Sequence, residues 1–215
     1  MPKNIAPLPD WELVLSSAAR LQRILPDAVL VGGTASAIHE LESVAGWKTA
    51  RVQRPVQILG SLDGIETGIR QLVRDEPLET TVVDYDDERI VVPTAGEILR
   101  IKGVLILKRN ATRDYLDFVA LADHLGDERT ALALQSFDRL YQQTSGESPL
   151  QQLQVQLANA LPYDLEETEL SEYKCLDSRW HEWNTVKAAC SHIATVTFDR
   201  VCDLQTDRSN DDGNG

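Results

Sequence analysis

The sequence predicts an α+β protein, in which helices and a small antiparallel or mixed sheet occupy separate stretches of the chain. Apolar residues recur at helical spacing near the N-terminus and again from residue 95 onward. Short runs rich in β-branched residues, separated by turn residues, fill the stretch between residues 47 and 94. Segregated helices and strands of this kind are typical of the α+β class.

Individual elements follow from spacing and from turn signals. The expected helices span residues 10–25, 34–44, 95–108, 127–143 and 148–161, and residues 109–126 form a connector and another helix that Gly126 ends. Expected strands span residues 28–31 and 47–60, the second of which is broken at Pro55, with two hairpins that pair 55–59 with 66–73 and 78–85 with 89–94. Glu97 lies three residues after Thr94, which is the spacing of a capping box at a helix start.

Composition restricts the class of protein. The chain has 215 residues, of which 42% are hydrophobic, and this suffices for a sizeable core. Its net charge of -13 repels polyanions and counts against a dedicated DNA-binding protein, although an enzyme that uses nucleotides stays possible. No apolar stretch approaches a membrane span, and the N-terminus lacks the layout of a signal peptide. We therefore expect a cytoplasmic protein that does not contact a membrane.

The cysteines and histidines offer no metal motif. Cys175, Cys190 and Cys202 have spacings that match no zinc site, and their odd number argues against a disulfide framework. The four histidines are isolated from one another. Buried or idle thiols are therefore expected, and Trp180 and Trp183 are expected to pack rather than to stack on a base.

Gly32-Gly33-Thr34 forms the first candidate site. Glycines at a turn from strand to helix let the backbone approach an anion, and the helix start offers free N–H groups. The alternative is a tight turn without a ligand. The sequence around it fits neither the P-loop nor the dinucleotide-binding pattern.

The second candidate site lies within RIKGVLILKRNATRDYLDF, residues 100–118. Lys102 stands among apolar residues of an expected helix, where a lysine needs an anion or a path to water. Asp114 and Asp117 are three residues apart and share a helix face, next to Arg113. The alternative interpretation is a charge network that stabilises a helix start.

LVGGTASAIH and RIKGVLILKRNATRDYLDFVALADHL together resemble the AbiEii/AbiGii-type nucleotidyltransferases, toxin-like members of the polymerase-beta nucleotidyltransferase superfamily. The resemblance covers about residues 25–126. It implies a nucleotidyltransferase-like mixed sheet flanked by helices. It also implies transfer of a nucleotidyl group from a nucleoside triphosphate (NTP), with Mg²⁺, to tRNA, another RNA or a protein, and a cognate antitoxin as partner.

The resemblance also implies roles for the candidate residues. Gly32, Gly33 and Thr34 are expected to line the triphosphate, Lys102 to contact its phosphates, and Asp114 or Asp117 to supply a catalytic carboxylate. The Asp-x-Asp pair that holds the metal in this family does not follow His39, as if a block were missing between Ile38 and Leu41. The metal ligands thus stay unknown. The alternative function is a catalytically degenerate module that binds a nucleotide or a protein, and a purely structural α+β protein is a third possibility.

The expected domain organisation has three parts. Residues 1–126 form the nucleotidyltransferase-like domain, residues 127–202 form a mainly helical C-terminal region, and residues 203–215 form a disordered acidic tail.

Overall fold

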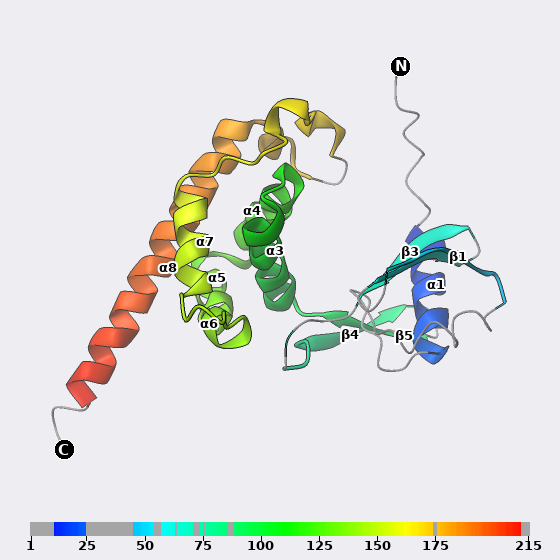
Figure 1. The fold of residues 1–215 in the computed structure, drawn as a ribbon, viewed down its shortest axis with the longest axis horizontal. Coiled ribbons are helices and arrows are strands. Elements are labelled where there is room, and N and C mark those ends of the chain that lie inside the picture. Colours follow the sequence, from blue (N-terminus) through cyan, green and yellow to red (C-terminus); the bar gives the residue numbers. More distant parts are fainter. Residues whose placement is uncertain are drawn as a thin grey trace. The chain divides into compact units, whose positions relative to one another are not determined.

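The computed structural model describes residues 11–24, 45–53, 57–62, 64–70, 74, 76–85, 88–173 and 176–211 (Figure 1). The chain divides into two compact units, Met1–Thr94 and Ala95–Gly215. Helices and two small antiparallel sheets make up these units, so the predicted α+β class is confirmed.

The first unit contains one described helix and five strands. These elements are α1 (Trp11–Ile24), β1 (Trp47–Gln53), β2 (Gln57–Leu62), β3 (Ile65–Arg70), β4 (Thr80–Tyr85) and β5 (Glu88–Pro93). The strands form a three-stranded sheet in the order β1-β2-β3 and a separate two-stranded sheet of β4 and β5. Both predicted hairpins are therefore confirmed, whereas a nucleotidyltransferase-like mixed sheet is not.

Close side-chain fits hold parts of the first unit together. Gly60 on β2 lies against Trp47 on β1, and a Cβ atom there would come within 2.5 Å of the indole ring. On the other sheet, the Gln22 amide of α1 donates to the Val91 carbonyl at 2.7 Å and accepts from the Val91 N–H at 2.9 Å. Gln22 thus satisfies one edge position of β5 in the way a neighbouring strand does.

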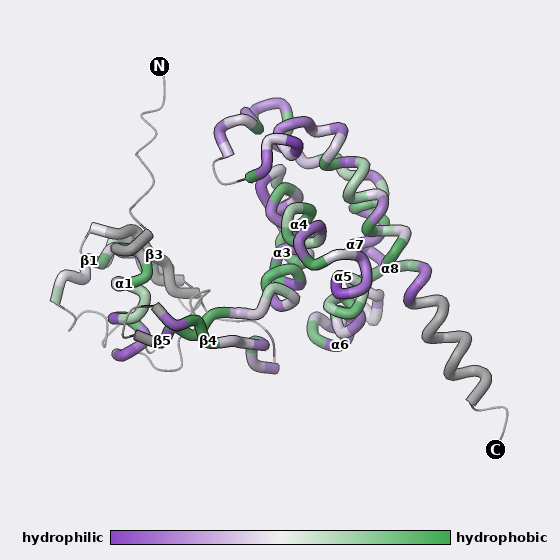
Figure 2. Tube along the Cα trace, turned by 180° about the vertical axis from the view of Figure 1, so that it is seen from behind, coloured by the Kyte–Doolittle hydropathy of each residue, from purple (hydrophilic) through white to green (hydrophobic). Residues whose placement is uncertain are grey.

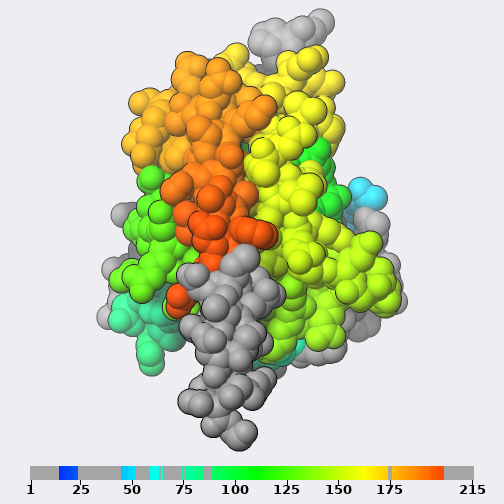
Figure 3. Space-filling view, turned by 90° about the vertical axis from the view of Figure 1, so that its left-hand side faces the viewer, coloured from blue at the N-terminus to red at the C-terminus, as the bar shows by residue number. Residues whose placement is uncertain are grey.

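The second unit is helical. Its elements are α3 (Ala95–Arg109), α4 (Thr112–Leu125), α5 (Asp127–Leu134), α6 (Phe137–Leu140), α7 (Pro149–Ala158), the 3₁₀ turns η1 (Leu165–Glu167), η2 (Leu170–Glu172) and η3 (Ser178–His181), and α8 (Trp183–Asp211). Helices α7 and α8 run side by side along one face (Figure 3).

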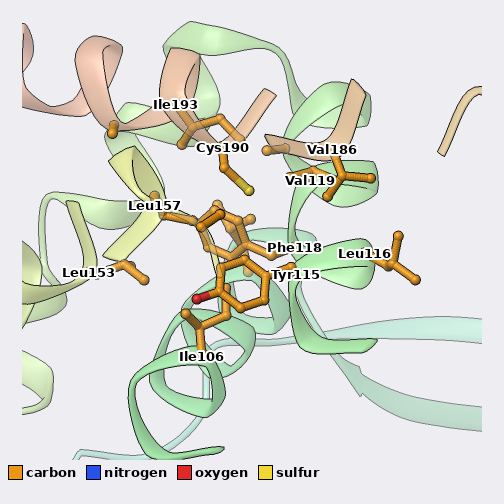
Figure 4. Packing of buried hydrophobic residues seen from close by; sticks show 14 of the residues in the cluster. Ile106, Tyr115, Leu116, Phe118, Val119, Leu153, Leu157, Val186, Cys190 and Ile193 are labelled. Atoms are coloured by element: carbon orange, nitrogen blue, oxygen red, sulfur yellow. The ribbon is translucent and has the colours of Figure 1, made fainter. Parts of the chain in front are cut away.

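One apolar cluster joins these helices. Tyr115 and Phe118 of α4 are fully buried, and they meet Leu157 of α7 and Cys190 of α8 in the centre of the cluster (Figure 4). Gly103 of α3 allows the closest approach, because a Cβ atom there would lie 2.9 Å from a Leu153 methyl group. Burying side chains of this size supplies most of the stability of such a unit.

Local signals set the ends of several helices. Gly126 has a φ of 77°, which favours glycine, and its N–H donates to the Ala122 carbonyl at the end of α4. Ser148 caps α7 by accepting from the Gln151 N–H at 3.0 Å, and Pro149 follows in the first turn. These starts and stops are close to those predicted from the sequence.

Other expectations differ from the structure. The helix predicted over 127–143 is interrupted between α5 and α6, because a turn at Ser136 lets both Leu134 and Phe137 face the core. The two compact units divide after Thr94, and α3 and α4 pack into the same core as the later helices, while the domain boundaries expected at residues 126 and 202 stay a prediction. Helix α8 is described as far as Asp211, within residues 203–215, whose expected role as a disordered acidic tail stays a prediction. Among the residues described, no helix has the length and apolarity needed to cross a membrane.

Candidate functional site

The second candidate site of the sequence is the turn between α3 and α4. Helix α3 ends at Arg109 and α4 begins at Thr112, so the chain reverses over two residues. Asn110 makes this possible with a φ of 48°, a left-handed conformation that asparagine tolerates better than most residues. The turn thus positions the charged residues of both helices near one another.

Hydrogen bonds fasten this turn to the segment that follows α7. The Asn110 amide donates to the Leu161 carbonyl at 2.9 Å, and its carbonyl oxygen accepts from Tyr115 and Gln156, both at 2.7 Å. The Tyr163 N–H donates to the Asn110 main-chain carbonyl at 3.0 Å. Burial raises the pKa of Tyr115 to about 12, so this hydroxyl stays a donor at neutral pH.

Asp164 completes the same junction. Its Oδ1 accepts from both the backbone N–H and the hydroxyl of Thr112, at 2.7 Å each. Ala111 at the N-cap position of α4 has no polar side chain, and Asp164 supplies the missing acceptor from a distant part of the sequence. We call this set of contacts, made by Asn110, Thr112 and Asp164, the turn clamp.

A charge cluster lies beside the turn clamp. Only 1% of the Asp114 side chain is exposed, and Arg109 donates to its two carboxylate oxygens at 3.1 and 2.8 Å. Lys102 reaches Asp117 at 2.5 Å and Asp114 at 3.9 Å. Arg113 lies 3.9 Å from Asp117, one turn along the helix.

The structure therefore brings three of the predicted site residues together, namely Lys102, Asp114 and Asp117. Each of these charged groups meets an opposite charge from the neighbouring helix or the adjacent turn. The alternative interpretation of the sequence was a charge network that stabilises a helix start; the structure in addition joins Lys102 of α3 to Asp117 of α4. Gly32, Gly33 and Thr34 lie outside the described residues, so their phosphate contacts stay a prediction.

Two further sets of polar contacts in the second unit also belong to its packing. The buried Glu97 accepts from Arg100 at 2.9 Å, and Arg100 also donates to the Ala133 carbonyl at 3.0 Å. Trp180 is buried, with the Arg179 guanidinium 4.5 Å from its ring centre. The described part of the chain contains no group of three or more histidine, cysteine or acidic residues that could hold a metal ion.

Two important residues were missed in the sequence. Asn110 lies in the quoted motif, and its tendency to adopt positive φ marks it as a turn residue. Asp164 carries no local signal, because its partner Thr112 is 52 residues away. Only the folded chain shows that the two belong together.

The chain is thus an α+β protein whose helical second unit is stabilised by internal polar contacts around the α3–α4 turn. No family model matches the sequence, and no solved structure is significantly similar to it. The sequence is 30% identical to the heme uptake protein MmpL11 of Mycobacterium tuberculosis over 232 residues, covering 92% of this chain and 24% of that protein. It is 26% identical to the mycolic acid-containing lipids exporter MmpL11 of Mycolicibacterium smegmatis over 226 residues, covering 94% of this chain and 23% of that protein. The chain thus spans about a quarter of the length of these relatives.

These relatives overturn the nucleotidyltransferase assignment. The resemblance to AbiEii/AbiGii-type toxins is wrong, and with it go the NTP, tRNA and antitoxin partners and the expected transfer reaction. The motif RIKGVLILKRNATRDYLDF, which carried the resemblance, is explained by packing between two helices. Lys102 and the RDYLD residues pair with one another across two helices, and this requires no substrate. An Asp-x-Asp strand is then not expected after His39, and no missing block need be invoked.

Proposed function

We propose that the chain takes part in membrane transport of an apolar cargo, as a folded binding region of a transport protein similar to MmpL11. The observation that carries this proposal is the extent of the similarity, which covers more than nine tenths of the chain. The relatives are named for heme uptake and for the export of mycolic acid-containing lipids. Both cargoes have large apolar surfaces.

The contacts of the second unit support a binding role rather than a catalytic one. Lys102, Asp114 and Asp117 are occupied by one another and by Arg109. Burial raises the pKa of the Cys190 thiol to about 12, which removes its nucleophilicity at neutral pH. Because these charged groups and the thiol take part in packing, we expect the outer surface of this unit to do the binding.

The proposal includes a cytoplasmic location. Cys190 is a free thiol inside the core, and free cysteines are ordinary in a reducing compartment. A membrane-impermeant amine reagent applied to intact cells tests this location. We expect the chain to be labelled only after lysis, and labelling of intact cells would overturn it.

A chimera tests the transport role. In MmpL11 of Mycolicibacterium smegmatis, the segment similar to this chain is replaced by residues 1–215, and lipid export is measured in cells without their own MmpL11. We expect export well above that of MmpL11 lacking the segment. A matched control carries Phe118→Asp, which places a charge in the core and should abolish the gain.

The amount of each protein in the membrane is measured beside export. A chimera that reaches the membrane in normal amount, yet exports no more than the protein lacking the segment, overturns the proposed function.

A further inference from the structure

Two large apolar side chains stand exposed just after α7. Leu161 is 67% exposed and Tyr163 is 75% exposed, while Pro162 between them is buried. A residue before proline favours an extended backbone, in which alternate side chains point the same way. The alternation of exposure therefore places Leu161 and Tyr163 together on the outer side of the segment.

The turn clamp holds the backbone of this apolar pair. The Leu161 carbonyl accepts from the Asn110 amide, and the Tyr163 N–H donates to the Asn110 carbonyl. The next residue, Asp164, binds Thr112 twice. Leu161 and Tyr163 are thus presented on a fixed backbone, and a partner that covers them loses little chain entropy on binding.

Acidic residues follow directly on this apolar pair. Residues 164–177 contain six carboxylates and one lysine. Glu166, Glu167, Glu169 and Glu172, on and between η1 and η2, are all exposed. The segment between α7 and α8 is accordingly coloured mostly hydrophilic in Figure 2. We call the set of Leu161, Tyr163 and these four glutamates the 161–172 surface.

We propose that the 161–172 surface binds a cationic amphipathic helix of a partner protein. The apolar face of such a helix covers Leu161 and Tyr163, and its lysines and arginines lie opposite the glutamates. Aromatic and aliphatic anchors surrounded by a polar rim are the usual arrangement of a binding hot spot. The same glutamates repel anionic lipid and nucleic acid, so charge complementarity selects a basic peptide.

This inference deepens the proposed function, because it names the surface by which a region of a transport protein would contact its partner. It also stands on contacts within this chain alone. Its test therefore uses the 215-residue chain and a peptide, without a transporter, and a failure of one proposal is distinguishable from a failure of the other.

The probe is a labelled synthetic peptide of about 18 residues, long enough for several helical turns, with leucine along one face and lysine elsewhere. Fluorescence anisotropy measures its affinity for the full chain at low and at physiological salt. We expect saturable binding that weakens several-fold with salt, and at least tenfold weaker binding to the anionic version in which glutamate replaces lysine.

Variants locate the binding site. Leu161→Ser with Tyr163→Ser should weaken binding at least tenfold, whereas Leu132→Ser, at a 65% exposed position of α5, should leave it unchanged. Glu166→Gln with Glu167→Gln should weaken binding several-fold and reduce its salt dependence. Glu128→Gln with Glu182→Gln removes the same charge from other exposed positions and should have a smaller effect.

All substituted side chains are exposed, so circular dichroism should show folded variants. The proposal is overturned if the peptide does not bind the wild-type chain, or if Leu132→Ser and the Leu161/Tyr163 variant behave alike. Equal binding of the anionic peptide, or stronger binding to vesicles of anionic lipid than to the cationic peptide, also overturns it.

Discussion

Replacing Asp114 by asparagine tests whether the charge cluster is part of the scaffold. Asparagine keeps nearly the same shape and removes the negative charge that Arg109 contacts at 2.8 and 3.1 Å and Lys102 at 3.9 Å. The side chain is buried, so water cannot replace the lost interaction. We therefore expect the variant to fold with clearly reduced stability.

The magnitude follows from burial and geometry. Breaking a buried ion pair costs about 3–5 kcal/mol when the remaining charge has no access to water. Half of the Arg109 side chain is exposed, so the guanidinium regains hydration in part. We expect a loss of about 2–3 kcal/mol, near the value of hydrogen bonds to charged groups. For a unit of this size the midpoint of thermal unfolding falls by roughly 10 °C.

Urea unfolding followed by circular dichroism measures the loss. Asp123→Asn is the matched control, because Asp123 lies on the same helix and pairs with Arg179 between half-exposed side chains. Such surface pairs contribute about 0–1 kcal/mol. A double-mutant cycle with Arg109→Gln should give a coupling of at least about 1 kcal/mol. Equal effects of Asp114→Asn and Asp123→Asn, or no coupling to Arg109, would refute a structural role for the cluster.

Three further predictions concern packing, the turn clamp and pH. Gly103→Ala should lower the free energy of unfolding in urea by about 1–3 kcal/mol, because the added Cβ would lie within 3.1 Å of Leu153 and Phe137. Gly96→Ala, whose Cβ would have its nearest neighbour 3.3 Å away, should be close to neutral, and the reverse order of the two losses would contradict the packing. Asn110→Gly tolerates the φ of 48° but loses the side-chain hydrogen bonds, so it should lower the free energy of unfolding by about 1–3 kcal/mol. Asn110→Ala should lower it further because alanine disfavours this φ, and equal losses would show that the backbone conformation contributes nothing. Burial raises the pKa of Cys190 from 9.0 and of Tyr115 from 10.0, each to about 12, so the folded chain favours their neutral forms. The stability of the fold should therefore be full below pH 9 and fall between pH 9 and 12. In thermal unfolding at each pH, Cys190→Ala should make the start of that fall less steep, and an unchanged slope would argue against the buried thiol.

The sequence predicted most of the helices and hairpins because their signals are local. Gly126, Ser148 and the apolar spacing of α3 and α4 act within one or two turns of the chain. The interruption between α5 and α6 was not predicted, because it depends on how Leu134 and Phe137 reach a core formed by other helices. Core contacts of this kind override local propensity.

The candidate site was predicted only as a grouping of residues. The helical spacing of Asp114 and Asp117 predicted that they share a face, and the isolated Lys102 in an apolar helix predicted that it needs an anion or a path to water, and the structure places these three charges near the turn. The sequence offered a charge network at the start of α4 as an alternative, but it did not reveal that Lys102 pairs with Asp117, since these two residues belong to different helices. A lysine paired with aspartate and a lysine that binds phosphate give the same sequence pattern. This is why the sequence was wrongly assigned to the nucleotidyltransferases.

The most direct test of the account is lipid export by the MmpL11 chimera carrying Lys102→Met with Asp117→Leu. This pair of substitutions removes the charges of Lys102 and Asp117 and keeps apolar bulk between α3 and α4. The ion pair is only partly buried, so its replacement by apolar side chains should be tolerated. If the charge cluster is scaffold and transport depends on the outer surface, the chimera should export lipid as well as its unsubstituted parent. A folded, membrane-located chimera that has lost export would instead place the function in the charge cluster itself.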